Sequence, residues 1–285
     1  MINRFGPEAP APSAPEVGDP WIAALAKSYM NYWQRALTKP TEREQAETDL
    51  RNQIGTLLSH PVSKDSDLDA AEDEITAEAL KRDFHVLLGR TPPLRELMLW
   101  KKLTVEQRQV SLPEGPHRVT VNLLDDFILR GWGYYATCSQ RSAGGWTTDN
   151  ALFAVVPAYG NLDGENFLVN FVAHETQHFA DKHSFPGLAS WELEYRAKLV
   201  ELALADSTQG STLQLICENR SDAKDSPHAF ADFHVINDLA KHLGASESDL
   251  CERKTVAGQL LRNAAKEVLL EDSRQRVQNR EAAAH

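Results

Sequence analysis

Two histidines and a glutamate lie within the five residues His174-Glu175-Thr176-Gln177-His178, a spacing that could bind a metal ion. Residues four apart share one face of an α-helix, so His174 and His178 can direct their imidazoles at a single Zn²⁺ ion. Glu175 would then lie beside the metal, where its carboxylate can take a proton from a zinc-bound water. The pattern predicts one Zn²⁺ per chain and hydrolysis with Glu175 as the base.

The segment before this motif is strongly apolar. Residues 167–173 read Phe-Leu-Val-Asn-Phe-Val-Ala, with one polar side chain among seven, and this run indicates a helix that enters the core. Buried histidine and glutamate side chains without partners would be costly, whereas a metal ion gives all three a partner. The alternative is a solvated helix whose charged residues match the pattern by chance.

Composition and charge exclude several classes of protein. The chain has 285 residues, of which 42% are hydrophobic, enough for one large domain or two modest ones. Its net charge is −11 and its pI about 5.4, and no segment supplies the basic face that nucleic-acid binding needs. No run of apolar residues is long enough for a transmembrane helix.

The cellular location of the protein depends on whether a signal preceded Met1, and the three cysteines do not decide it. Residues 1–20 are rich in proline, have no hydrophobic signal core and are expected to form a flexible lead-in. The protein is cytoplasmic if Met1 is the native start, and exported if an N-terminal signal was removed. Cys217 and Cys251 either form a disulfide in an oxidising space, leaving Cys138 free, or are two buried thiols; we expect thiols.

Residues 21–115 are predicted to form a helical N-terminal region. Apolar residues recur at helical spacing up to Pro40, and residues 41–44 have the Thr-x-x-Glu pattern of a capping box that begins a second helix. A third helix is expected over 67–88, with Gly89 as its stop. These apolar stripes indicate helices that pack on a core and do not indicate a functional site.

Residues 116–285 are predicted to form the metallohydrolase domain. Two strands are expected, near 119–128 and over 151–156, separated by an irregular aromatic-rich segment. Further helices are expected over 190–205, 227–243 and 249–280. The predicted fold class is α+β: a small mixed β-sheet beside the active-site helix, with helical parts before and after it.

The motif supplies only two ligands, whereas a catalytic zinc site keeps three protein ligands and one open position. Asp181 would lie about 10 Å along the helix axis from His174, too far to close the same coordination sphere. His183 is one residue out of register with the longer H-E-x-x-H-x-x-G-x-x-H pattern, which excludes the metzincin group.

With the segment 191–198, the chain resembles the gluzincin, thermolysin-like branch of the zincin metallopeptidases, whose third ligand is a glutamate on a second helix. The resemblance covers roughly residues 118–243. It implies that a turn at Pro186-Gly187 folds the second helix back antiparallel, and that Glu194 is the third zinc ligand, with Glu192 as the alternative. It also implies peptide hydrolysis, with a peptide or protein as substrate.

The chain departs from the family pattern at one position, Lys198. Related proteases often have E-x-x-A-D here, and its acid supports a zinc histidine, whereas this chain has Glu194, Ala197 and then Lys198. Glu201, one turn further along the same face, is the candidate substitute. The departure favours a second hypothesis, a noncatalytic zinc-binding protein that acts as a partner-binding module; the presence of Glu175 argues against it.

The resemblance implies two further features. Gluzincins commonly bind the developing oxyanion with a downstream histidine or tyrosine, and His228, at the start of a predicted helix, takes that place. Tyr134, Tyr135 and Tyr159 are alternative donors, and a surface or capping histidine is the other interpretation of His228. The strand over 151–156 would be the edge strand, whose backbone pairs with an extended substrate.

Overall fold

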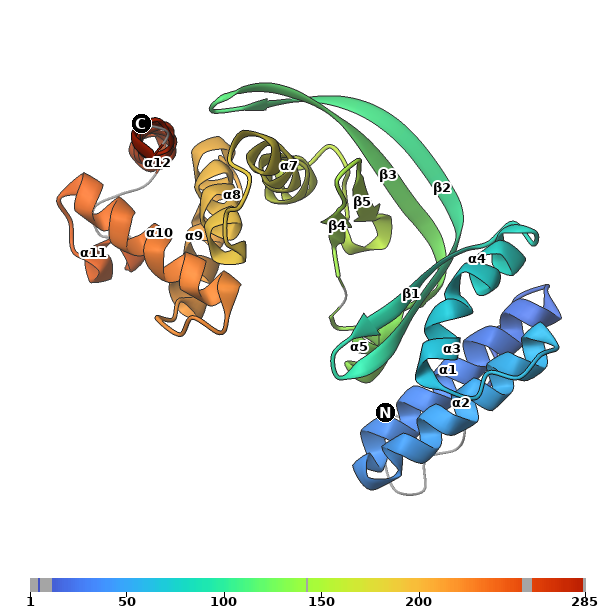
Figure 1. Cartoon of the computed structure of the whole chain (residues 1–285). Coiled ribbons are helices and arrows are strands. Elements are labelled where there is room, and N and C mark those ends of the chain that lie inside the picture. The colour runs from blue at the N-terminus through green and yellow to red at the C-terminus, as the bar shows by residue number, and fades with distance from the viewer. Residues whose placement is uncertain (1–4, 6–11, 142, 253–257, 284–285) are drawn as a thin grey trace. The chain divides into compact units, whose positions relative to one another are not determined.

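The computed structural model describes residue 5 and residues 12–141, 143–252 and 258–283 (Figure 1). It has the predicted α+β class, with helical N- and C-terminal parts and one mixed five-stranded sheet in the order β1-β2-β3-β5-β4. Most of the expected lead-in, residues 1–4 and 6–11, lies outside the described residues. The chain divides into two compact units, which are described separately.

Unit 1 comprises Met1–Thr104 and Leu123–Ala143. Asp19 caps helix α1 by accepting a hydrogen bond from the Ile22 amide, and the helix packs its apolar face against α2. The predicted capping box of Thr41 and Glu44 is wrong: a 3-10 turn, Pro40–Glu42, precedes α2, whose N-cap residue Glu42 makes no side-chain capping bond. The helices of this unit are α1 Pro20–Thr38, α2 Arg43–Leu58, α3 Asp65–Ala70, α4 Glu72–Leu80 and α5 Gly131–Ala136.

The helix predicted over 67–88 is wrong in its second half. Helix α4 ends at Leu80, and strand β1, His85–Thr91, pairs antiparallel with β2, Leu94–Leu112. Gly89 lies inside β1 with φ of +124° and does not end a helix. A short apolar run such as 84–88 fits a strand as well as a buried helix, and here pairing with a distant segment decides the outcome.

Unit 2 comprises Val105–Asn122 and Gly144–His285, so β2 and β3 each contribute to both units. Its strands beyond β2 are β3 Gly115–Arg130, β4 Gly145–Thr147 and β5 Leu152–Val155. Its helices are α6 Glu165–Phe167, a π-helical segment Leu168–Ala173, α7 His174–Ser184, α8 Ser190–Leu204, α9 Gln209–Asn219, α10 Pro227–Leu243, α11 Glu247–Cys251 and α12 Gln259–Ala283.

Helix α8 is central to unit 2 and contacts α7, α10 and α12 (Figure 1). Leu199, Val200 and Leu202 on α8 are fully buried in the core of this unit. The helices predicted over 190–205 and 227–243 are confirmed, and α10 ends at Gly244 in the left-handed conformation, as expected of a glycine stop. Helix α9 was not predicted, because its serine, threonine and glycine residues are typical of a loop.

The C-terminal helix predicted over 249–280 is two helices, α11 and α12, and residues 253–257 between them lie outside the described part of the chain. The expectation of two thiols is also wrong. Cys217 on α9 and Cys251 on α11 form a disulfide, and Cys138 is the exposed free cysteine. The spacing alone could not reveal this pairing, because 34 residues separate the two positions along the chain.

Removing this disulfide should destabilise unit 2. The double variant Cys217→Ser/Cys251→Ser frees a loop that the cross-link closes, and the chain-entropy model gives a loss of roughly 3–4 kcal/mol in the free energy of unfolding. Urea denaturation of the two proteins measures the difference. A variant of the free cysteine, Cys138→Ser, is the control and should unfold like the wild type. Equal midpoints for all three proteins would contradict the expectation.

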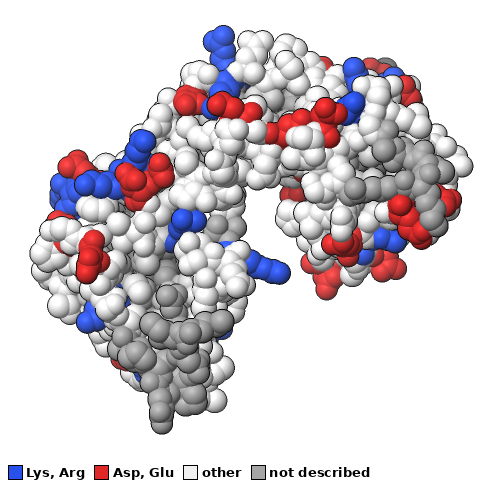
Figure 2. Space-filling view, turned by 180° about the vertical axis from the view of Figure 1, so that it is seen from behind, with Lys and Arg blue, Asp and Glu red and all other residues white. Residues whose placement is uncertain are grey.

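On the face that Figure 2 shows, the described residues form no continuous basic area. Lys and Arg side chains form small groups there, interspersed with Asp and Glu. Within the described residues, no helix has the length and apolar character needed to cross a membrane.

Candidate metal centre

The metal-binding motif lies where a buried segment turns into a half-buried helix. Phe171 and Val172 are buried in the π-helical segment, which leads directly into α7 at His174. His174 and Glu175, the first two residues of α7, are only partly buried. The predicted helix with both histidines on one face is therefore confirmed.

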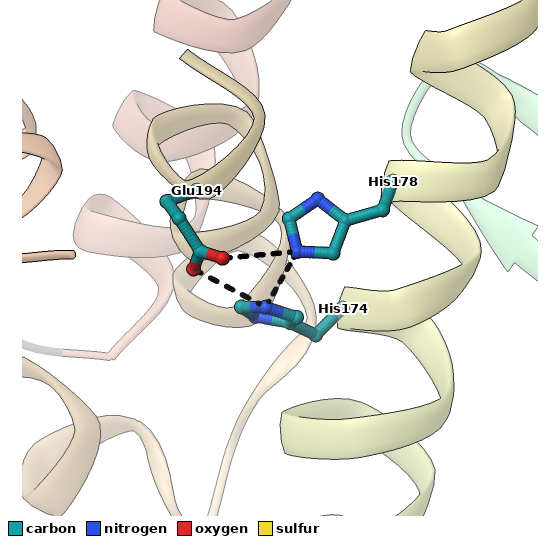
Figure 3. Close-up of side chains that lie close together, drawn as sticks. All are labelled: His174, His178 and Glu194. Carbon is teal, nitrogen blue, oxygen red and sulfur yellow. Dashed lines mark hydrogen bonds and ion pairs between the residues drawn. The ribbon is translucent and has the colours of Figure 1, made fainter. Parts of the chain in front are cut away.

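His174, His178 and Glu194 point toward one another from the two neighbouring helices α7 and α8 (Figure 3). The Nε2 atoms of the two histidines are 3.0 Å apart. Glu194 Oε1 lies 3.4 Å from His178 Nε2, and Glu194 Oε2 lies 3.6 Å from His174 Nε2. One potential ligand atom from each residue thus lies within 4.8 Å of the others.

These separations fit a single small cation. Tetrahedral zinc with ligands at 2.0–2.2 Å requires its ligand atoms to be about 3.3 Å apart, close to the observed 3.0–3.6 Å. Burial would raise the pKa of Glu194, but contacts with His178 and His228 and the charge of His174 lower it well below its usual range. The carboxylate is therefore charged and ready to bind a cation.

The other candidates for the third ligand all have partners elsewhere. Their contacts are Asp181 with Arg196 at 2.9 Å, His183 with the Phe179 carbonyl at 2.8 Å, and Glu192 with Arg276 at 2.9 Å. The structure therefore brings Glu194, and none of these three side chains, to the two histidines.

Glu201 binds the Nδ1 atom of His174, on the opposite side of the ring from the Nε2 atom that faces the cluster. Its Oε1 lies 2.6 Å from His174 Nδ1, and its Oε2 accepts a hydrogen bond of 2.6 Å from Asn170 Nδ2. Burial would lower the pKa of His174, but the hydrogen bond and charge of Glu201, with the charges of Glu194 and Glu175, raise it above its ordinary value. Glu201 thus occupies the supporting position that Lys198 cannot fill.

Replacing this support should weaken metal binding without removing a ligand. We expect Glu201→Gln to bind zinc about 10- to 100-fold more weakly, because a carboxylate behind a histidine ligand orients the ring and raises its basicity. Competition with a chromophoric chelator measures the affinity. Glu192→Gln, on the same helix but bonded to Arg276, is the matched control; an equal loss there would rule out a specific role for Glu201.

His228, at the start of α10, also reaches this cluster. Its Nδ1 lies 2.9 Å from Glu194 Oε2, while most of its side chain is exposed to solvent. One turn later on the same helix, Asp232 pairs with Lys198, one turn beyond Glu194 on α8. Two charge pairs therefore join α10 to α8 beside the metal cluster, and His228 contacts a candidate ligand.

A cavity of about 570 Å³ opens beside His174 and Glu175. The lining comes from α7, from Lys198 and Glu201 on α8, from one face of α9, and from Tyr159. Glu175 Oε2 accepts a short hydrogen bond from Thr147 on β4. Glu175 thus lies next to the metal cluster and at the wall of a space large enough for part of a substrate.

The edge strand beside Glu175 is β4, and not the strand predicted over 151–156. The segment 151–156 was expected to be the edge strand, but β5 lies between β3 and β4. Of the two edge strands in the sheet order, β1 and β4, it is β4 that carries Thr147, which bonds Glu175. Residues 145–147 have the sequence pattern of an irregular segment, because three residues are too few to show the alternation of apolar and polar side chains that marks a strand.

A buried network of charged side chains next to α7 and α8 could not be predicted from the sequence. The guanidinium of Arg196 is fully buried on α8 and binds three carboxylates that come from separate parts of unit 2: Glu114 at the tip of the β2–β3 hairpin, Asp181 on α7 and Asp272 on α12. Only the burial of an arginine could have signalled this network, and burial depends on the tertiary structure.

The other two tyrosines offered as oxyanion donors belong to unit 1. Tyr135 is buried in the core of that unit against Trp33, and Tyr134 stacks under the guanidinium of Arg130. Tyr159 lines the cavity that contains Glu175. A Cβ atom on Gly144 would lie 2.7 Å from the Tyr159 hydroxyl oxygen, so glycine at that position leaves room for the hydroxyl.

Comparison with protein-family models, curated proteins and solved structures gave no match to this chain.

Proposed function

We propose that this protein is a zinc-dependent metallopeptidase that binds one Zn²⁺ through His174, His178 and Glu194. The observation that carries the proposal is the position of Glu175. Its carboxylate lines a cavity beside three convergent ligand atoms, without being one of them. A purely structural metal site needs its ligands and has no use for a neighbouring base at a cavity wall.

The residues around the cavity have distinct roles in this proposal. A bound zinc ion would polarise the scissile carbonyl and lower the pKa of a coordinated water. Glu175 removes the proton from the attacking water and later delivers it to the leaving amine. The hydrogen bond from Thr147 keeps the Glu175 carboxylate at the cavity wall. In this proposal the edge strand β4 would pair with an extended peptide.

Tyr159 is better placed than His228 to donate a hydrogen bond to the developing oxyanion. Tyr159 lines the cavity that contains Glu175, whereas His228 is not among the described residues of that lining. The Nδ1 atom of His228 lies instead 2.9 Å from Glu194 Oε2. Burial, and next the charge of Glu175, raise the pKa of Tyr159 above its usual range, so its hydroxyl keeps its proton.

Two variants distinguish these donors. Tyr159→Phe should keep its zinc and lose about 10²-fold in kcat, the usual effect of removing one oxyanion donor. His228→Ala should bind zinc more weakly and recover most of its activity at saturating zinc, because its contact is with Glu194. Steady-state kinetics across a zinc titration gives both results. A 10²-fold loss in His228→Ala that persists at saturating zinc would instead make His228 the donor.

The test of the proposal is cleavage of a peptide library by the zinc-loaded protein, followed by metal analysis of the same sample. We expect cleavage that stops when a chelator removes the zinc and returns when zinc is added. The competing hypothesis is a noncatalytic partner-binding module. It would be supported by stoichiometric zinc, a fourth protein ligand on the metal and no cleavage of any library member. Lys198 no longer favours it, because Glu201 supplies the support for His174.

A further inference from the structure

Lys198 was singled out in the sequence because it stands where related proteases have an acid. In the structure, Glu201 makes the bond to His174, so that role is filled and Lys198 has different neighbours. Glu194, Lys198 and Glu201 are spaced four and three residues apart, and therefore lie on one face of α8. Lys198 is thus placed between a candidate metal ligand and the residue that supports another.

Within the described part of the chain, the charged partner of the Lys198 ammonium is Asp232. Its Nζ lies 2.9 Å from Asp232 Oδ1 on α10. Asp232 is 2% exposed and is not part of the cavity lining, whereas Lys198 is part of it. An ammonium has three protons to donate, and the pair with Asp232 uses one direction. Asp232 therefore holds the ammonium from outside the lining, and Lys198 itself lines the cavity, where its other N–H donors can bond a ligand.

Lys198 is the main charged hydrogen-bond donor to a ligand in this cavity. It is the only Lys or Arg among the described residues that line this cavity. Both carboxylate oxygens of Glu201 already have partners, His174 and Asn170. The Thr212 hydroxyl accepts a hydrogen bond from Asn170, so its own proton is free to be donated. The ammonium of Lys198 and the hydroxyl of Thr212 can thus both donate hydrogen bonds in the lining of this cavity, beside the candidate metal centre.

We propose that Lys198 anchors a carboxylate of the substrate, supplied by an acidic side chain or by the C-terminal α-carboxylate of a peptide. This inference rests on the proposed peptidase function, because the cavity is the one beside Glu175. A charge-assisted hydrogen bond to a carboxylate is shorter and stronger than one to a neutral amide. The carboxylates of Glu175 and Glu201 in the same lining provide the competing outcome, a preference for cationic groups.

The test measures binding, so that it does not depend on cleavage. Zinc-loaded Glu175→Gln protein is titrated with labelled penta-alanine peptides that carry one Glu or one Gln at each position in turn, with both ends blocked. A second pair has a free or an amidated C-terminus, and lysine-containing peptides complete the set. Fluorescence polarisation gives the dissociation constants. The first series detects an acidic side chain, and the second detects an α-carboxylate.

We expect at least one carboxylate peptide to bind roughly 10- to 100-fold more tightly than its neutral partner. The preference should disappear in Lys198→Met, which keeps the aliphatic stem, and persist in Lys198→Arg. Because Lys198→Met leaves buried Asp232 without its partner, the double variant Lys198→Met/Asp232→Asn is measured alongside and should lose the preference too. Lys182→Met, on the surface of α7 and outside the cavity lining, is the matched control.

The outcomes separate this inference from the proposed function. Equal binding of every matched pair, tighter binding of lysine peptides, or a carboxylate preference that survives the loss of Lys198 would overturn the anchor, even in a protein that cleaves peptides. A carboxylate preference that depends on Lys198 in a protein that cleaves nothing would support the anchor and refute the peptidase.

Discussion

Glu175→Gln should retain zinc and fold like the wild type, while hydrolysis of any library substrate falls by about 10³-fold or more. Glutamine keeps the size of the side chain and can still bond Thr147. It cannot accept the proton of the attacking water, so the general base is lost together with the water activation that depends on it. Initial rates at saturating zinc, with zinc content measured on the same protein, give the comparison.

The matched control is Glu218→Gln, an exposed glutamate on α9 that bonds Gln214 and makes no contact with the metal cluster. It should cleave at the wild-type rate. A Glu175→Gln protein that remains active would refute the mechanism, because no other carboxylate among the described lining residues is free to act as the base. Glu201, the second one, is already bound to His174 and Asn170.

The double variant His174→Ala/His178→Ala should lose nearly all bound zinc. The wild type should hold about one Zn²⁺ per chain after dialysis, because three protein ligands with two histidines on one helix make a strong site. We expect Glu194→Ala to retain some zinc at reduced affinity, since the histidine pair remains. Elemental analysis of the dialysed proteins measures the stoichiometry.

His242→Ala provides the control for a general effect of removing a histidine. His242 lies on α10 and pairs with Glu267 at 3.0 Å, in the same kind of contact that His228 makes with Glu194. This variant should keep its full zinc content. Stoichiometric zinc in the double variant would show that the metal binds elsewhere, and undiminished affinity in Glu194→Ala would show that Glu194 is not a ligand.

The parts of the fold that could be predicted are those that local spacing determines. The metal-binding motif needs only the periodicity of a helix, so the convergence of His174 and His178 followed from the sequence. Helices α8 and α10 were predicted because a proline or glycine marks their ends. The position of Glu194 required a resemblance, because it depends on how one helix packs on another.

The parts that could not be predicted depend on partners distant in sequence. Strand β1 exists because β2 pairs with it, and the Arg196 network joins side chains up to 82 residues apart. Helix α9 has little local signal, yet packing against α8 and α10 and the disulfide to α11 hold it in place. In each of these regions tertiary contacts outweigh local preference.

The order of the two units along the chain limits how the part that contains the candidate metal centre can be isolated. The chain enters unit 2 at Val105, leaves after Asn122 and returns at Gly144, so this unit is discontinuous in sequence. A fragment that begins at residue 116 would lack Glu114, and with it a carboxylate that binds Arg196 behind the metal helices. Transfer of this site to another protein would therefore have to replace three chain crossings between the units, at 104/105, 122/123 and 143/144, and not a single linker.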